Sequence, residues 1–307
     1  MASSSNPAFA NPAFQEPGAQ RPGLTPPAAQ TQFGTSSAQS VDLAAQAQME
    51  GAFAAPAAGA VNTGRMTVED TVVKTLSLFA ILLVTAVVGW IWTMAGVTPE
   101  NPSNVSILPW IIGALGGFVL SMVVIFTSRK KIRPALIFAY AAFEGLFIGG
   151  ISAYFEFLWP GIVVQATLAT LSVVGVTLAL FASGKVRASA KATKVFLIAM
   201  VGYLVFSLIN VVMMMFGAFS GPDSAGPFGM YSQPSFIFGI PWGVIIGIFV
   251  VLMAAYSLVL DFDSIQQGVR NGAPRQYGWL GAFGLMVTVV WLYVELLRMI
   301  AILRGNN

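Results

Sequence analysis

The sequence predicts an all-α protein in which seven helices cross a membrane as a bundle, preceded by a disordered N-terminal segment. Hydrophobic residues make up 56% of the 307 residues and charged residues only 9%, whereas soluble domains contain about 25% charged residues. Seven apolar runs follow residue 65, and each is long enough to cross about 30 Å of hydrocarbon as a helix. The strict polar/apolar alternation of a membrane β-barrel is missing.

The chain changes composition at residue 65. Residues 1–65 are rich in Ala, Pro, Gln, Ser and Gly and contain no apolar stretch of the signal-peptide type. Because such a segment buries too little apolar surface to compensate for the entropy of ordering, we expect a disordered tail. It contains Asn-Pro-Ala-Phe twice, at 6–9 and 11–14, either as a docking motif for a partner or as low-complexity turns. Residues 66–307 form the expected transmembrane domain.

The transmembrane domain begins with a helix-start signal at Thr67. Thr67 is a favourable N-cap, and Glu69 and Asp70 lie in the first turn, where the helix dipole favours acids. The predicted spans are 72–95, 107–127, 135–155, 161–182, 195–217, 237–263 and 279–303. Glycines four residues apart predict close helix contacts in three spans: Gly113 and Gly117, Gly145 and Gly149, and Gly239, Gly243 and Gly247.

Basic residues predict the orientation of the spans. The loops at 128–134, 183–194 and 264–278 together contain ten Lys and Arg residues, whereas the loops near 96–106, 156–160 and 218–236 contain none. Loops rich in basic residues stay in the cytoplasm. We therefore expect a multi-pass protein of the cell membrane with a cytoplasmic N-terminus and an external C-terminus. Topology accounts for the basic residues, so the lipid bilayer is the expected partner and nucleic acid is not.

Four carboxylates lie inside or at the end of predicted spans: Glu144, Asp261, Asp263 and Glu295. A charged group at the centre of a membrane helix costs about 2.5–3.5 kcal/mol or more, and such residues commonly line ion pathways. The chain has no His and no Cys, which excludes thiol catalysis, imidazole bases and the usual zinc sites. The acids are therefore the first candidates for function.

Each acid also has a structural alternative. Asp261 and Asp263 either hold a cation such as Ca²⁺, which prefers oxygen ligands, or pair at the membrane interface with Arg129 or Lys130. Glu144 is either part of an ion pathway or a hydrogen-bonded packing residue. For Glu295, the alternative to a pathway role is a local ion pair with Arg298, three residues further along the helix.

The segments around these acids resemble the Bax inhibitor-1/YccA family of seven-span proteins, in particular its bacterial YccA-like members. The resemblance rests on Phe143-Glu144-Gly145 in span three, on residues 256–265 at the end of span six, and on residues 291–303 in span seven. It covers about residues 66–304 and is most specific in spans six and seven.

The resemblance implies a central last helix and an acidic pair on spans six and seven that gates a pH-sensitive calcium leak. The span-six acid corresponds to Asp261, but the partner position in span seven is Thr288, which is not an acid. Glu295 follows seven residues later, within about 20° of the same helix face. We therefore expect Glu295 and Glu144 to continue one polar pathway for Ca²⁺ or H⁺ that has Asp261 and Asp263 at its inner mouth, with no cofactor.

Two other functions are alternatives to a cation leak. The resemblance also implies a regulator of a membrane protease of the FtsH type, for which the N-terminal tail would be the contact segment. An intramembrane aspartyl protease needs two aspartates on adjacent spans, whereas Asp261 and Asp263 share one span. We therefore expect no enzymatic activity.

Overall fold

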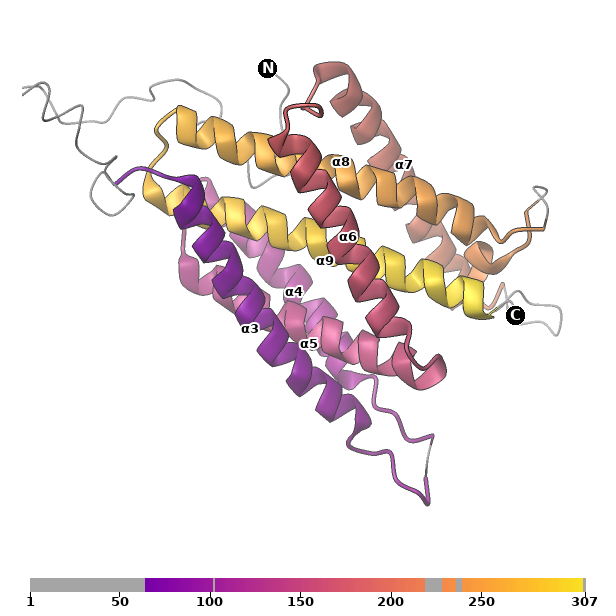
Figure 1. Ribbon diagram of the computed structural model, residues 1–307. Coiled ribbons are helices and arrows are strands. Elements are labelled where there is room, and N and C mark those ends of the chain that lie inside the picture. The colour runs from indigo at the N-terminus through magenta and orange to yellow at the C-terminus, as the bar shows by residue number, and fades with distance from the viewer. Residues whose placement is uncertain (1–63, 102, 219–227, 236–238, 306–307) are drawn as a thin grey trace, which may run out of the picture.

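The computed structural model describes residues 64–101, 103–218, 228–235 and 239–305, and long α-helices dominate these ranges (Figure 1). The long helices are α3 (Val68–Met94), α4 (Leu108–Ser128), α5 (Pro134–Leu158), α6 (Ile162–Ala182), α7 (Ala190–Met215), α8 (Trp242–Arg270) and α9 (Gly278–Gly305). The short 3₁₀ helices η3 (Gly229–Ser232) and η4 (Arg275–Tyr277) precede α8 and α9. The seven long helices are each apolar enough to cross a membrane, which confirms the predicted fold class. The predicted disorder falls on residues 1–65, of which 1–63 lie outside the described residues.

Helix boundaries follow local capping signals. Thr67 caps α3 as predicted, because its Oγ1 accepts a hydrogen bond from the N–H of Asp70 at 3.2 Å. The sequence prediction starts the fifth span at 195, after the lysines, but α7 begins at Ala190 because Ser189 caps it. The sixth span was predicted over 237–263, yet α8 begins only after Pro241, whose backbone is extended (φ −56°, ψ 140°). α8 then continues to Arg270, so Asp261 and Asp263 lie inside the helix and not at its end.

Helices α3, α4 and α5 form a closely packed group with α5 in the middle (Figure 1). Glycines permit this approach. A Cβ atom at Gly149 would meet the backbone of Ala86 in α3, and one at Gly113 would meet the backbone of Phe147 in α5. Close backbone approach supplies packing energy where lipid removes the hydrophobic driving force. The glycine faces predicted for spans two and three are therefore confirmed as helix contacts.

The third predicted glycine face is wrong at one position. Gly239 precedes α8, has a left-handed backbone (φ +71°) and would have no atom within 4 Å of an added Cβ. Gly243 and Gly247 do lie in α8, and they face Ile302 and Met299 of α9. The α8–α9 contact thus begins with Gly243, and Gly239 serves the turn that leads into the helix.

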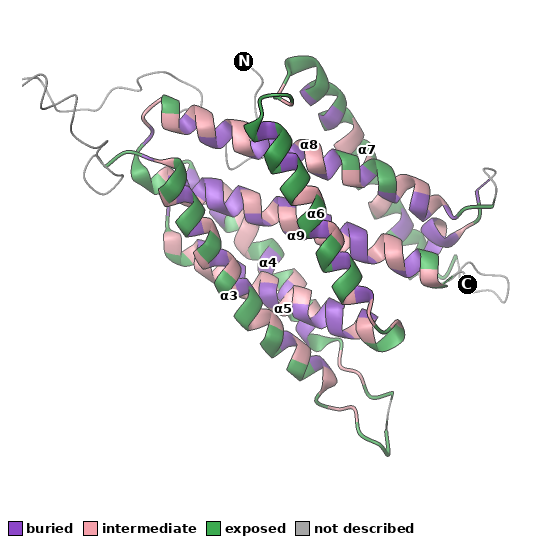
Figure 2. Cartoon of the chain, viewed as in Figure 1, coloured by how far each residue is buried: buried purple, intermediate pink, exposed green. Residues whose placement is uncertain are grey.

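α9 is the central helix, as the family resemblance implies. It contacts α3, α5, α6 and α8, and Leu280, Met286, Leu292 and Leu297 on it are fully buried. α7 is peripheral: its main contacts among the described elements are with α8 and η3, and many of its side chains are exposed (Figure 2). The bundle therefore combines a firmly packed centre with one loosely attached helix.

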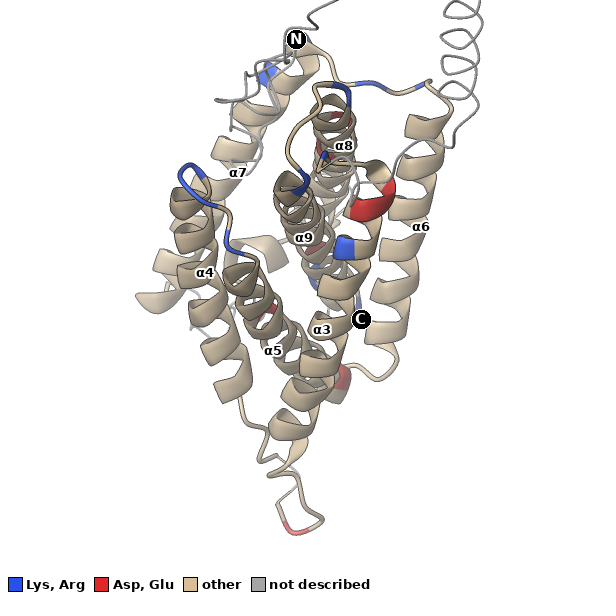
Figure 3. Ribbon diagram, turned by 90° about the vertical axis from the view of Figure 1, so that its left-hand side faces the viewer, with Lys and Arg blue, Asp and Glu red and all other residues tan. Residues whose placement is uncertain are grey.

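Lys and Arg gather at one end of the bundle (Figure 3). Since successive helices run in opposite directions, the α4–α5, α6–α7 and α8–α9 connections all lie at this end. The α3–α4 connection lies at the other end (Figure 1). The structure thus brings the basic loops to one side, while the side of the membrane they face stays a prediction.

Candidate functional site

A buried carboxylate joins the two helices that carry the family resemblance. Asp261 of α8 has an exposed fraction of 0%, and Thr288 of α9 one of 3%. The Thr288 hydroxyl donates a hydrogen bond to Asp261 Oδ2 at 2.6 Å. The two helices also approach closely at Gly281 of α9, where an added Cβ would lie 3.0 Å from Ile265, one turn after Asp261. The Asp261–Thr288 contact therefore lies in the core between α8 and α9.

The contact places an ionisable group where water is excluded. A hydrogen bond to a charged group is worth about 1.5–3 kcal/mol, which offsets only part of the cost of a carboxylate at this depth. Thr288 itself is uncharged, although it occupies the position where the resemblance implies a second acid. A cation that moves between α8 and α9 would meet the Asp261 oxygens.

Asp263 does not share a site with Asp261. It is half-buried and accepts a hydrogen bond from Gln267 Nε2 at 2.7 Å, and two residues along a helix turn the side chain by about 200°. Within the described residues, no group of three or more acids is arranged to hold a metal ion. The structure thus does not place the two aspartates side by side, and Ca²⁺ binding by them stays a prediction.

The predicted basic partners of Asp261 lie elsewhere. Arg129 and Lys130 are exposed at the end of α4, whereas Asp261 is fully buried between α8 and α9. The prediction that they pair at the interface fails because α8 continues past Asp261 to Arg270, which moves the carboxylate away from the helix end.

Glu295 lies in a separate cluster on α9. One of its oxygens accepts hydrogen bonds from the Tyr203 hydroxyl and from Trp291 Nε1, the latter at 3.3 Å. The other oxygen forms an ion pair with Arg298. The Arg298 guanidinium also lies over the ring of Tyr231, 4.1 Å from its centroid. The local ion pair, one of the two alternatives for Glu295, is what the structure contains, and its charge is compensated.

The residues that complete this cluster are not among those predicted from the sequence. Besides Tyr203, α7 contributes Ser207, which hydrogen-bonds to the Tyr231 hydroxyl at 2.7 Å, and Asn210, which accepts from the N–H of Met230 at 2.7 Å. These polar residues of α7 follow the i, i+4, i+7 spacing of one helix face. That spacing was the available signal, and it marks the side on which α7 is held to η3 and α9.

Glu144 lies in a third place. It is half-buried on α5, within hydrogen-bonding reach of Tyr140 one turn earlier. Together with Gly117 and Ser121 of α4 it lines a cavity of about 220 Å³. Its surroundings belong to α4 and α5, whereas those of Glu295 belong to α7, η3 and α9. The structure does not bring Glu144, Glu295 and Asp261 together in one polar pathway.

A polar cluster at the basic end ties the start of α3 to the α8–α9 connection, and it was not predicted. Asp70 forms ion pairs with Lys74 and with Arg275, the latter at 2.9 Å. The backbone adds two hydrogen bonds, from Met66 N–H to Ala273 C=O at 2.7 Å and from Arg275 N–H to the carbonyl at residue 64 at 2.9 Å. The point at which the N-terminal segment enters the bundle is thus fixed to the turn between α8 and α9.

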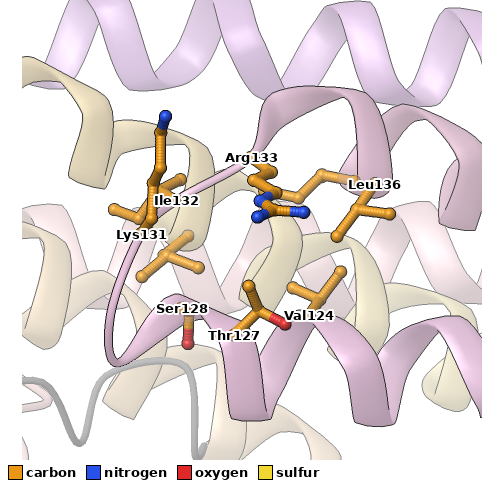
Figure 4. A pocket seen from close by; sticks show the side chains of 9 residues that line it. Val124, Thr127, Ser128, Lys131, Ile132, Arg133 and Leu136 are labelled. Atoms are coloured by element: carbon orange, nitrogen blue, oxygen red, sulfur yellow. The ribbon is translucent and has the colours of Figure 1, made fainter.

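The α4–α5 connection contains a small cavity (Figure 4). It is lined by basic residues, Lys131 and Arg133, and by apolar ones that include Val124 and Leu136. Its volume of about 10 Å³ is close to the minimum that holds one water molecule. The cavity is too small for a ligand. Lys131 and Arg133 are therefore interpreted only as part of the basic loops that predict the orientation of the spans.

A family model described as Bax inhibitor 1 like matches residues 6–305. The chain belongs to the Bax inhibitor 1-like family. The sequence resemblance was predicted to begin at about residue 66. The match extends it to most of the N-terminal segment, including the Asn-Pro-Ala-Phe repeat. Searches of curated proteins and of solved structures found no match to the chain.

Proposed function

We propose that this Bax inhibitor 1-like protein is a pH-sensitive leak pathway for Ca²⁺ or another cation, without enzymatic activity, and that the Asp261–Thr288 contact is its gate. The observation that carries the proposal is a fully buried carboxylate between two core helices, hydrogen-bonded to a neutral hydroxyl at 2.6 Å. Carboxylates at bilayer depth commonly mark ion and proton pathways, and carboxylate oxygens are ligands for Ca²⁺.

The pH sensitivity follows from the hydrogen bond itself. An ionised carboxylate only accepts hydrogen bonds, whereas a protonated one carries a donor of its own. Protonation of Asp261 therefore changes its hydrogen bond with Thr288, and with it the contact between α8 and α9. Asp263, half-buried and two residues closer to the basic end, lies on another side of α8 and is not part of this contact. The gate thus responds to pH through Asp261.

Glu295 and Glu144 have other parts in this proposal. The charge of Glu295 is balanced by Arg298, so Glu295 holds α7 in place and does not replace the acid that is missing at Thr288. Glu144 lines its own cavity beside α4 and is not on the pathway between α8 and α9.

The proposal is tested by reconstituting the purified full-length chain in lipid vesicles and measuring Ca²⁺ entry with an enclosed dye at a series of pH values. Flux above that of protein-free vesicles, with a clear dependence on pH, is expected. Thr288→Asp creates a second acid beside Asp261, and since two neighbouring carboxylates titrate as a coupled pair, this variant should shift the pH midpoint. Flux equal to that of protein-free vesicles at every pH would contradict the proposal.

Regulation of a membrane partner, such as a protease of the FtsH type, is the second candidate. It is favoured by the family match, which begins at residue 6, and by the attachment of the chain at residues 64–66 to the α8–α9 turn. Deletion of residues 2–60 should leave Ca²⁺ flux intact and abolish co-purification of the protease from membranes. If the protease co-purifies equally with the truncated chain, the tail is not the contact segment.

A further inference from the structure

An apolar cavity of about 220 Å³ opens near the basic end of the bundle, between α3, α6, α8 and α9. Its wall is mostly hydrocarbon. The apolar lining includes Val72 of α3, Leu178 and Phe181 of α6, and Phe262 and Ile265 of α8. Val72 and Leu178 are about half exposed, at 49% and 48%, so the cavity borders the surface that faces the acyl chains.

Two arginines converge at the edge of this cavity. Gln266, which lines it, accepts hydrogen bonds at the same Oε1 atom from Arg187 at 3.2 Å and from Arg270 at 3.0 Å. Both arginines are exposed, and neither forms an ion pair with a carboxylate in the described ranges. Two guanidinium groups this close repel each other, so an anion between them would be stabilised.

The charged edge and the apolar cavity form one continuous surface. The Arg187 guanidinium lies over the ring of Phe181, 5.2 Å from its centroid, and Phe181 lines the cavity. Arg187 lies in the α6–α7 connection and Arg270 is the last residue of α8, so both lie at the basic end, where phosphate groups of the adjoining leaflet are found.

We propose that this surface is a binding site for an anionic phospholipid, with an acyl chain in the cavity and the phosphate between Arg187 and Arg270. The two arginines make the site selective for anionic over neutral lipids, because basic pockets between transmembrane helices favour acidic headgroups. The acyl chain gives no such selectivity, since every membrane phospholipid has one. The planar guanidinium also matches the geometry of phosphate oxygens. The inference is independent of the proposed cation leak, since it concerns lipid binding alone.

The site is tested by titrating the full-length chain in neutral detergent with phosphatidylglycerol or phosphatidylcholine and measuring bound lipid by native mass spectrometry. Tighter binding of phosphatidylglycerol is expected. Arg187→Gln with Arg270→Gln should weaken it roughly 30-fold, from the contribution of two basic residues, and leave phosphatidylcholine unchanged. The matched control is Lys185→Gln with Lys191→Gln, which removes the same charge from exposed positions in the α6–α7 connection and the first turn of α7 and should leave both affinities unchanged.

A second variant tests the acyl-chain part of the site. Val72→Trp places an indole at the cavity, and it should weaken phosphatidylglycerol binding while both arginines remain. Inorganic phosphate at equal concentration should not displace the lipid. Equal binding of the two lipids by the unmodified chain, equal losses in the arginine and lysine variants, or full displacement by phosphate would each overturn the proposal.

Discussion

Asp261 and Glu295 are both buried carboxylates in the core helices, but they are bonded to different side chains. Glu295 has an arginine beside it and two further donors, from Tyr203 and Trp291. Asp261 is more deeply buried, and its hydrogen bond across the helix contact comes from the neutral hydroxyl of Thr288. The ion pair and the two donors hold Glu295 in its ionised form, whereas protonation of Asp261 changes the hydrogen bond that joins α8 to α9. In the proposed leak pathway, this difference favours a structural role for Glu295 and places the gate at Asp261.

The largest expected effect on stability comes from removing the charge of Glu295. Glu295→Gln leaves Arg298 without its partner at a position where the two side chains are only 7% and 16% exposed. Loss of one member of a buried ion pair costs about 3–5 kcal/mol. We therefore expect a fall of about 3 kcal/mol in the free energy of unfolding, measured by chemical denaturation in detergent micelles.

Two controls sharpen this prediction. Glu69→Gln alters an exposed acid of α3 and should change stability by less than about 0.5 kcal/mol. The double variant Glu295→Gln with Arg298→Gln removes both charges and should recover most of the loss. If the double variant is no more stable than Glu295→Gln alone, the ion pair is not what holds this region together.

A smaller effect is expected at the gate. Thr288→Val keeps the shape of the side chain but removes the donor to Asp261, which should lower the free energy of unfolding by about 1–3 kcal/mol. Thr170→Val is the matched control, since Thr170 is also buried but donates to the carbonyl of Ala166 in its own helix. Equal losses in the two variants would mean that the Asp261–Thr288 bond contributes nothing specific.

The smallest loss of stability is expected for an exposed ion pair, and it is the reference for the losses at Glu295 and Thr288. Arg275, whose side chain is 45% exposed, pairs with Asp70, and exposed pairs are worth about 0.2–1 kcal/mol. Arg275→Gln should therefore cost less than about 1 kcal/mol in the same denaturation experiment. Arg129→Gln, at an exposed position of the same end, provides the comparison. A loss at Arg275 as large as that at Glu295 would contradict the ranking of the two environments.

The seven helices could be predicted because span length and the placement of basic residues are local properties of the sequence. Some helix ends were missed where a single residue decides them, as at Ser189 and Pro241. The acids were visible in the sequence, and so were Arg298 and Thr288 as partners of Glu295 and Asp261, but the partners that α7 contributes were not. Tyr203 and Glu295 are 92 residues apart and meet only because α7 folds back to α9. Contacts of this kind depend on how the helices pack, which no local pattern contains.

The central claim is tested most directly by the pH dependence of Ca²⁺ flux in vesicles that contain Asp261→Asn. Asparagine still accepts the Thr288 hydrogen bond but does not titrate in this range, so the account predicts flux that no longer depends on pH. The double variant Glu295→Gln with Arg298→Gln should keep the pH profile of the unmodified protein. An unchanged profile in Asp261→Asn, or a flattened one in the double variant alone, would contradict the assignment of the gate to Asp261.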